Sequence, residues 1–408
     1  MARSPLTLAA VATSALPGTT FVGSGELGHR ETGSYDSALL LADDDTRFVV
    51  RIPTNQQAET DQARELLVLQ AMSDGIRSRL PFDVHRVLGQ APTGDTRAVV
   101  YDYLPGYQVD ADAIPAGDGV ASSMGGALAA LHALPGSFVA EAGLPVQSAS
   151  DSRSEARNII ERAASTKLLP AAVRKRWADA AADDALWRFQ PTVIGGSIAA
   201  DSFLITDHSA GPIVTGMIGW GSLRVADPAR DLHWLSAAGE AAESVFAAYV
   251  AASTRTPDAM IRQRSMLYAE LELARWLLHG RDLHDQAIID DAVAMLDGLV
   301  DSVLGNLMSP ISSSPGPVMT VADVQEMLKN TPEAPASAGS SAISMDTDSF
   351  DPEEFERELA RTSGETAEAE DADEPASPDD QETGPIDVSQ LRENDDSQRD
   401  RSSSSDDT

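Results

Sequence analysis

The spacing of apolar and polar residues predicts strands and one helix in the first hundred positions. Two apolar and β-branched runs, at 37–41 and 47–53, flank three consecutive aspartates, and this pattern predicts a hairpin. Residues 58–73 place their leucines on one helical face. Two further runs, 84–88 and 98–104, predict a second pair of strands, so this region is expected to be strands with one inserted helix.

The chain from there to about residue 306 is predicted to be mostly helical. A helix at 121–134 ends at Pro135-Gly136, and two short β-like runs at 203–205 and 213–218 predict a hairpin. Further helices are expected at 152–165, 171–188, 229–252, 258–280 and 284–306. A small β-rich lobe followed by a larger helical lobe indicates an α+β, two-lobed, protein-kinase-like fold with a nucleotide cleft between the lobes.

The N-terminus and the hydropathy pattern bear on localisation. Residues 5–12 are mildly apolar, but a signal peptide has a longer apolar stretch and a more basic start. Pro17-Gly18 instead marks the end of a short first helix. No apolar run approaches the roughly 18 residues that span a bilayer. We therefore expect a cytoplasmic protein with no membrane partner.

Charge divides the chain unevenly. Its 408 residues include 64 acidic and 30 basic ones, for a formal net charge of −34. Residues 331–408 hold 24 acidic residues against five arginines and no lysine, so they carry −19 and leave −15 for residues 1–330. This negative charge argues against nucleic acid as a partner, because phosphate contacts need Lys and Arg. The absence of cysteine from the sequence excludes disulfides, thiolate catalysis and cysteine-bound zinc.

Composition also places the expected domain boundaries. We predict an N-lobe at 1–104, a helical C-lobe at 105–308 and a disordered acidic Ser/Pro-rich tail at 309–408, which has too few apolar residues to offset its chain entropy. Two amphipathic segments of the tail, 320–328 and 351–359, carry apolar residues at helical spacing. Either segment is a candidate for folding onto an unidentified protein partner, and transient helicity without a partner is the alternative.

Residues 23–28 match G-x-G-x-x-G, a pattern found in loops that contact phosphates. The segment does not follow a clear strand or open a helix, and it stands ahead of the predicted 35–53 hairpin rather than within a hairpin. We therefore expect an ordinary glycine-rich loop, with a phosphate-covering loop as the alternative.

Three short motifs in residues 192–235 give the strongest functional signal: Gly195-Gly-Ser-Ile-Ala-Ala-Asp-Ser202, Ile218-Gly-Trp220 and Asp227-Pro-Ala-Arg-Asp231-Leu. Their spacing resembles the aminoglycoside and macrolide phosphotransferase family, which carries His-Gly-Asp-x-x-x-x-Asn, then Ile-Asp-Trp after a short hairpin, then Gly-Asp-Pro-x-x-Asp-Leu. Upstream segments resemble the family's third strand, helix C, lobe-linking segment and following helix, at 48–53, 65–69, 101–106 and 128–132. The resemblance covers about residues 5–306 and implies the kinase-like fold.

The chain departs from this family where the chemistry is expected. The family's catalytic aspartate falls on Ser197, its metal-binding asparagine on Ser202 and its metal-binding aspartate on Gly219. Phosphoryl transfer to a hydroxyl needs a carboxylate to orient the acceptor and oxygen ligands to hold Mg²⁺. A serine hydroxyl is a poor base and glycine has no side chain. We therefore expect no intact catalytic residue, no metal and no required cofactor.

Positions that would face a nucleotide are partly retained. The resemblance places Arg51 where a kinase lysine contacts phosphates, and Arg51 can pair with Glu65 or with a phosphate. An ordinary structural ion pair is the alternative. Together with Tyr101, Asp102 and Tyr103 of the lobe-linking segment, these two residues are the candidate nucleotide-binding set.

Residues with a structural role in the family are retained as well. The resemblance gives structural roles to Trp220, Asp227 and Asp231, and Asp227 before a proline is in addition a typical helix N-cap. Asp201 and Asp207 are the acids nearest to the lost positions. Either could hold a cation, and solvated loop acids are the alternative.

Three hypotheses follow. The first is a pseudokinase of this family that binds a ligand or a protein. The second is an active but atypical small-molecule O-phosphotransferase that uses ATP or GTP with Mg²⁺ and displaced catalytic groups. The third is a structural scaffold whose cleft is filled by side chains.

Overall fold

The computed structural model describes residues 3–27, 33–255, 257–304 and 311. The chain divides into two units, 1–359 and 360–408, and all described residues belong to the first. The predicted disorder of the tail and the two amphipathic segments, 320–328 and 351–359, lie outside the described residues.

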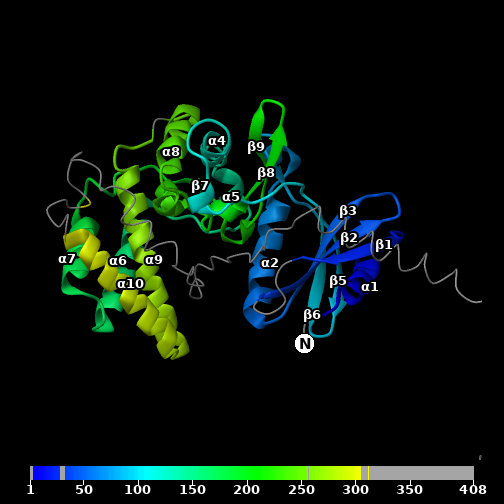
Figure 1. Ribbon diagram of the computed structural model, residues 1–408, viewed down its shortest axis with the longest axis horizontal. Coiled ribbons are helices and arrows are strands. Elements are labelled where there is room, and N and C mark those ends of the chain that lie inside the picture. The colour runs from blue at the N-terminus through cyan, green and yellow to red at the C-terminus, as the bar shows by residue number, and fades with distance from the viewer. Residues whose placement is uncertain (1–2, 28–32, 256, 305–310, 312–408) are drawn as a thin grey trace, which may run out of the picture. The chain divides into compact units, whose positions relative to one another are not determined.

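A five-stranded antiparallel sheet forms the N-terminal part (Figure 1). Its strands lie in the order β1-β2-β3-β6-β5, with bounds β1 (Phe21–Glu26), β2 (Tyr35–Ala42), β3 (Arg47–Pro53), β5 (Val87–Thr93) and β6 (Thr96–Asp102). Helix α1 (Pro5–Ala15) precedes the sheet, and α2 (Gln56–Ala71) and α3 (Asp74–Arg77) follow β3. The predicted arrangement of strands with an inserted helix is therefore present.

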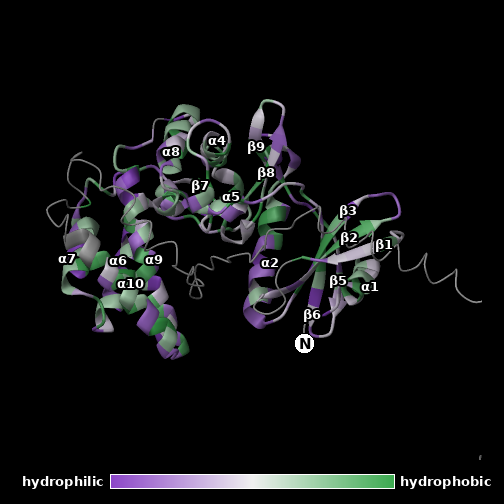
Figure 2. Ribbon diagram, in the orientation of Figure 1, coloured by the Kyte–Doolittle hydropathy of each residue, from purple (hydrophilic) through white to green (hydrophobic). Residues whose placement is uncertain are grey.

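Helix α1 packs on the sheet through a small core of its own. Leu8 is fully buried there beside Leu40 and Val50. Gly89 of β5 permits this packing, because a Cβ at that position would lie only 2.1 Å from the carbonyl oxygen of Ala15. Figure 2 shows α2 hydrophilic over its N-terminal half and hydrophobic toward its C-terminal end, which contributes to the main core.

The first two glycines of the 23–28 motif lie in strand β1. Gly23 and Gly25 lie within β1 and pair with Leu41 and Leu39 of β2. The motif therefore belongs to a hairpin, and the expectation that it stands ahead of one is wrong. β1 is an edge strand in which glycines replace most of the apolar residues, so it lacks the alternation that marks the other strands. Gly28 lies outside the described residues.

The C-terminal part consists of helices around two small sheets. Its α-helices are α4 (Val120–His132), α5 (Ser137–Glu141), α6 (Ala149–Ser165), α7 (Ala171–Ala182), α8 (Ala241–Ala252), α9 (Ile261–Leu283) and α10 (Gln286–Leu304). Its strands are β4 (Asp83–Val84), β7 (Thr192–Ile194), β8 (Phe203–His208), β9 (Gly211–Met217) and β10 (Arg224–Ala226). The predicted central hairpin is β8–β9, which β4 extends, while β7 pairs with β10.

Two predicted elements are divided in the structure. The expected strand at 84–88 is split, because β4 pairs with β9 whereas β5 joins the five-stranded sheet. The expected helix at 229–252 is a 3₁₀ helix, η4 (Pro228–Ala237), followed by α8. Gly239 lies between them with φ +59°, a left-handed conformation that no α-helix can include.

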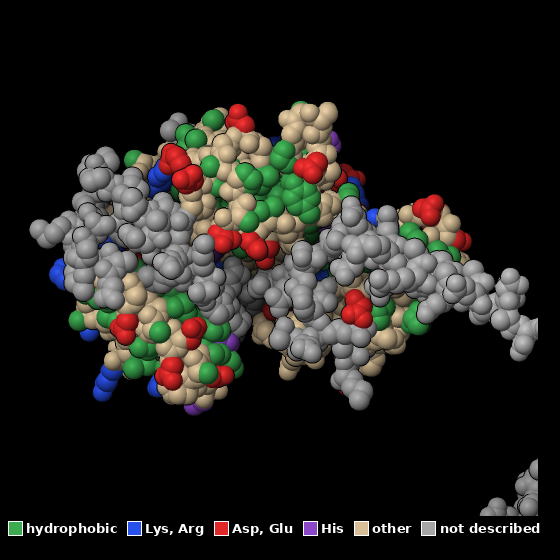
Figure 3. All heavy atoms as spheres, viewed as in Figure 1, with side chains coloured by type: hydrophobic (Ala, Val, Ile, Leu, Met, Phe, Trp, Pro, Cys, Tyr) green, Lys and Arg blue, Asp and Glu red, His purple; other side chains and the backbone are tan. Residues whose placement is uncertain are grey.

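Helices α4 and α8 pack closely against each other within the main core. Gly125 allows this approach, because a Cβ there would lie 2.3 Å from the carbonyl oxygen of Val245. On the face drawn in Figure 3, basic side chains are sparse and acidic side chains lie in separate places among hydrophobic and other polar ones.

Candidate functional site

The segment 195–202 leads from β7 to β8 and is held by a buried carboxylate. Asp231 of η4 is fully buried and accepts hydrogen bonds from the backbone N–H groups of Gly195, at 2.7 Å, and Gly196, at 2.8 Å. Nε2 of His132, on α4, lies 3.3 Å from the same carboxylate. Charge-assisted bonds of this kind fix the backbone of the segment.

Of the two glycines at the start of this segment, Gly196 is sterically required and Gly195 is crowded by a side chain. Gly196 has φ +83°, and a Cβ there would lie 2.5 Å from the carbonyl oxygen of Ser222. At Gly195 a Cβ would lie 2.4 Å from the side chain of Ile198. The position that matches the family's histidine therefore has no room for a side chain while Ile198 keeps this place.

Ser202 and Gly219 lie next to each other, as the motif alignment predicts for two metal ligands. Gly219 is left-handed, with φ +85°, and the nearest atom to a Cβ there would be Oγ of Ser202, at 3.9 Å. That hydroxyl accepts a hydrogen bond from the N–H of Ala199 at 3.1 Å. Gly219 supplies no side-chain oxygen. The residues present therefore do not fit Mg²⁺, which prefers several carboxylate or water oxygens in octahedral geometry.

The two acids nearest to this point lie on different elements. Asp207 lies on the β8–β9 hairpin, where its carboxylate accepts a hydrogen bond from Tyr107 at 3.0 Å. Asp201 belongs to the 3₁₀ turn η2 (Ala200–Ser202), and its carbonyl oxygen accepts a bond from Gln108. Among the residues that the structure describes, no group of three or more His, Asp or Glu could hold a metal ion. Ser197, at the position of the family's catalytic aspartate, is 8% exposed.

Arg51 and Glu65 form a buried ion pair between β3 and α2. Their closest atoms, Nη1 and Oε2, are 3.4 Å apart, and the guanidinium lies 3.9 Å from the centre of the Tyr35 ring. Nε2 of His85 lies 3.4 Å from the other Glu65 oxygen. Burial opposes ionisation of Glu65, but His85 and the charge of Arg51 outweigh it and keep the pKa of the carboxyl below its usual range. Arg51 is thus held between an acid and an aromatic ring.

The other candidate nucleotide-binding residues lie at the end of β6. Tyr101 is 1% exposed, its ring centre is 4.8 Å from that of His85, and burial raises the pKa of its phenol well above the usual value. The carboxylate of Asp102 accepts the backbone N–H of Arg86. Tyr103 is half-buried near the guanidinium of Arg47. The structure places Tyr101 in the core, beside Arg51 and Glu65, and leaves Asp102 and Tyr103 more accessible.

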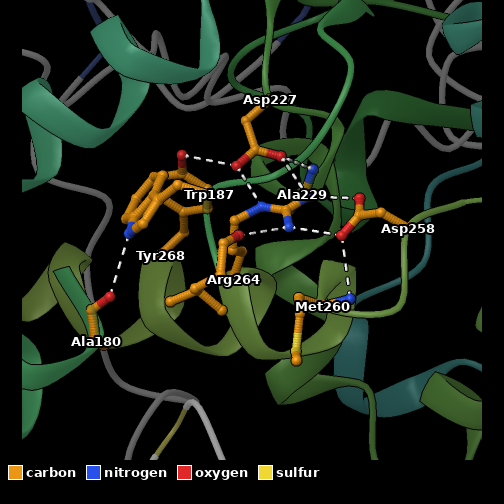
Figure 4. A network of polar contacts seen from close by, with 9 residues as sticks. Ala180, Trp187, Asp227, Ala229, Asp258, Met260, Arg264 and Tyr268 are labelled. Carbon is orange, nitrogen blue, oxygen red and sulfur yellow. Dashed lines mark hydrogen bonds and ion pairs between the residues drawn. The ribbon is translucent and has the colours of Figure 1, made fainter. Parts of the chain in front are cut away.

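Asp227 belongs to a second buried network, shown in Figure 4. Its carboxylate caps η4 through the N–H of Ala229, accepts two bonds from Arg264 and accepts the hydroxyl of Tyr268 at 3.0 Å. Arg264 is fully buried and also donates to Asp258, from Nη1 at 2.7 Å and from Nη2 at 2.8 Å. This network ties η4 to α9. The sequence carries no signal for the partners, which lie far from Asp227 along the chain.

A further set of arginines, also without a sequence signal, lies beside the 195–202 segment. Nε of Arg224 would be 3.1 Å from a Cβ on Gly196. Glu155 of α6 accepts bonds from Arg230 at 2.9 Å and Arg275 at 3.2 Å. Burial and the charge of Arg230 lower the pKa of Arg224 to about 10. Burial opposes ionisation of Glu155, but Arg230 and Arg275 outweigh it and lower its pKa to about 2.

Trp220 fixes the turn that carries Gly219. It belongs to the 3₁₀ turn η3 (Trp220–Ser222), it is fully buried, and its indole N–H donates to the carbonyl oxygen of Met217 at 2.8 Å. The ring stacks on Phe82 with 6.3 Å between centres. Position 219 is therefore held firmly beside position 202, although neither residue carries a strong metal ligand.

These elements define a two-lobed, protein-kinase-like fold of the α+β class. Its parts are the antiparallel sheet with the inserted helix, the helical part, and strands β7, β8 and β9 around the segment that Asp231 holds. The chain belongs to the phosphotransferase enzyme family, whose model matches residues 31–264. This confirms the family and the fold inferred from the motifs. Comparison with the curated proteins gives no match.

Solved structures of low sequence identity share the fold. A macrolide 2'-phosphotransferase type I is 23% identical with a TM-score of 0.58, and the match covers 72% of this chain and 98% of that one. The apoenzyme of the macrolide 2'-phosphotransferase MphH from Brachybacterium faecium is 21% identical with a TM-score of 0.60, covering 71% and 96%. The GDP and kanamycin complex of APH(2")-IIia is 20% identical with a TM-score of 0.57, covering 71% and 96%.

One negative finding concerns membranes. Within the described part of the chain, no helix has both the length and the apolar character needed to cross a bilayer.

Proposed function

We propose that this chain is a non-catalytic member of the phosphotransferase family, a pseudokinase that acts by binding a ligand or a protein. The observation that carries the proposal is the pair Ser202 and Gly219. The two positions meet in space, yet together they offer one hydroxyl, which already accepts a backbone hydrogen bond. Ser197 likewise offers a hydroxyl where phosphoryl transfer needs a carboxylate.

The retained residues support the same proposal. Asp231 and Asp227 still organise the backbone around the site, through Gly195 and Gly196 in one case and Arg264 in the other. The chain thus keeps the residues that support the loop but lacks the acids that would act from it. This pattern is expected when the fold is maintained without selection for phosphoryl transfer.

The same reasoning limits what a nucleotide can do here. Arg51, Glu65 and Tyr101 are 7%, 3% and 1% exposed, so a nucleotide at the lobe-linking segment has Asp102 and Tyr103 as its more accessible contacts. We expect any binding of ATP or GTP to be weak and independent of Mg²⁺. The scaffold hypothesis, in which side chains fill the cleft, draws its support from this burial.

The alternative is an active but atypical O-phosphotransferase that uses ATP or GTP with Mg²⁺. The Arg51–Glu65 pair and the glycine motif in the β1–β2 hairpin favour it, since both features suit phosphate contact. For such an enzyme the positive charge of Arg224 beside Gly196 would favour a neutral or anionic acceptor over a polycationic one.

The test is a calorimetric titration of the full chain with ATP and GTP, with and without Mg²⁺, followed by assay of nucleoside diphosphate release with macrolide and aminoglycoside acceptors. The pseudokinase proposal predicts no effect of Mg²⁺ on binding and no acceptor-dependent release. Mg²⁺-dependent binding together with acceptor-dependent release would replace it with the enzyme alternative.

A further inference from the structure

A cavity of about 840 Å³ lies within the helical part. Its walls come from the C-terminal ends of α4 and α8, the segment that leads into β7, and the start of η4. Figure 1 shows α4, α8 and β7 close together. Neither the Ser202–Gly219 pair nor the Arg51–Glu65 pair lines it. Its volume falls in the range of sites for small organic ligands.

The lining combines apolar walls with a cationic rim. Leu134, Phe189 and Ile261 contribute apolar surface, while Arg188 and Arg255 line the cavity with exposed side chains. Apolar walls with a few convergent charges fit a molecule that has an apolar body and an anionic group.

Two polar groups of the lining sharpen this assignment. Oγ1 of Thr192 is buried and has no hydrogen-bond partner among the described residues, so it is an unsatisfied polar atom in the wall of the cavity. Asp258 also lines the cavity, but its carboxylate already accepts two hydrogen bonds from Arg264. The one positive charge of Arg264 is shared between Asp258 and Asp227, whereas the lining arginines, Arg188 and Arg255, are exposed.

One wall of the cavity is connected to the 195–202 segment. His132 and Tyr249 both line it, and the Tyr249 hydroxyl lies 2.8 Å from Nδ1 of His132. Nε2 of the same ring faces the Asp231 carboxylate, which only accepts. Nε2 therefore donates to Asp231, and Asp231 in turn holds Gly195 and Gly196.

We propose that this cavity binds a small amphipathic organic anion, a carboxylate or sulfonate with an apolar body, and that occupancy is relayed through Tyr249, His132 and Asp231 to the backbone of the 195–202 segment. The site would give a chain without phosphoryl-transfer chemistry a ligand of its own. It does not depend on the proposed lack of catalysis, because none of its residues belongs to the catalytic positions.

The binding test is a fluorescence titration of the full chain with anilinonaphthalenesulfonate, an aromatic sulfonate. The double variant R188E/R255E changes only exposed side chains and is expected to weaken binding of the probe by about tenfold. A133W places a bulky side chain in the cavity lining, at the exposed end of α4, and is expected to weaken binding by a similar factor. The matched controls R79E/R174E and A140W make the same changes at exposed positions outside the lining. Unchanged affinity in both R188E/R255E and A133W would overturn the site.

The relay is tested by hydrogen–deuterium exchange of the peptide that contains Gly195 and Gly196. Bound anilinonaphthalenesulfonate is expected to slow exchange there in the wild type. Tyr249→Phe removes the hydroxyl that bonds to His132, so the probe should still bind while the effect on the loop disappears. A loop response that persists in Tyr249→Phe would overturn the relay, and so would a wild type that binds the probe with no change in exchange.

Discussion

Replacing Arg264 with methionine should destabilise the chain far more than the same change two residues away. Arg264 is fully buried and donates to Asp227 at 2.7 and 3.1 Å, to Asp258 at 2.7 and 2.8 Å, and to the carbonyl oxygen of Leu186 at 2.9 Å. Arg264→Met leaves Asp227, itself fully buried, with Tyr268 and a backbone N–H as its remaining partners.

The loss of unfolding free energy follows from the buried carboxylate that remains without its partner. Removing one partner of a buried ion pair costs about 3–5 kcal/mol of unfolding free energy, because the other charge stays buried without compensation. For a folded part of this size, that loss corresponds to a fall of roughly 6–15 °C in Tm. Burial opposes the charge of Arg264, but Asp258 and Asp227 outweigh it and raise the pKa of the guanidinium above its usual value, so Arg264 is charged at any ordinary pH.

Urea denaturation followed by circular dichroism measures the effect, with Arg262→Met as the matched control. Arg262 lies on the same helix and also donates two bonds to one acid, Glu243 at 2.6 and 2.8 Å, but both side chains are exposed. Exposed pairs contribute about 0–1 kcal/mol. If the two variants lose similar free energy, the buried network does not hold η4 to α9 as described.

Two further predictions concern packing and charge. Gly126→Ala in α4 should raise the unfolding free energy by about 0.5–1 kcal/mol, because its Cβ meets no atom within 4 Å. Gly125→Ala should lower the unfolding free energy by about 1–3 kcal/mol, because its Cβ clashes with Val245. Equal shifts of the same sign in the urea midpoints of the two variants would refute the close contact between α4 and α8. Glu155→Gln should destabilise the chain at pH 7. Since the pKa of Glu155 is lowered from 4.5 to about 2, its contribution is complete above pH 4.5 and is lost as the pH falls toward 2. The difference between wild type and variant in urea titrations should therefore shrink over that range; a difference that grows on acidification would reverse the assigned sign.

The sequence predicted those parts of the fold whose signals are local. Helix α2 was found because its leucines repeat at helical spacing, and β2–β3 because its apolar runs flank a turn of aspartates. β1 could not be found in the same way, because it owes its place to pairing with β2 rather than to apolar residues of its own. The break at Gly239 depends on a positive φ that the sequence does not reveal.

The candidate site was predictable only as far as the motifs extend. The resemblance placed two metal-ligand positions of the family on Ser202 and Gly219, and the structure brings these two residues together. Hydrogen bonds between residues distant in sequence were not accessible, such as Arg264 with Asp227 or Arg230 with Glu155. Asp227 and Arg230 lie in the Asp227–Asp231 motif, but Arg264 and Glu155 lie in no motif, and an arginine in an amphipathic helix is ordinarily a surface residue.

The central claim is that the positions of Ser202 and Gly219 no longer hold a metal. The most direct test is the ratio of ATP affinities with and without Mg²⁺, measured by calorimetry for the wild type, for S202N/G219D and for the control G94D. Both glycines are left-handed and have no atom nearer than 3.9 Å to a Cβ, so the two aspartates carry similar backbone strain. The account predicts a ratio near one for the wild type and for G94D, and a gain of about tenfold with Mg²⁺ for S202N/G219D. A wild-type chain that already binds ATP more tightly with Mg²⁺ would contradict it.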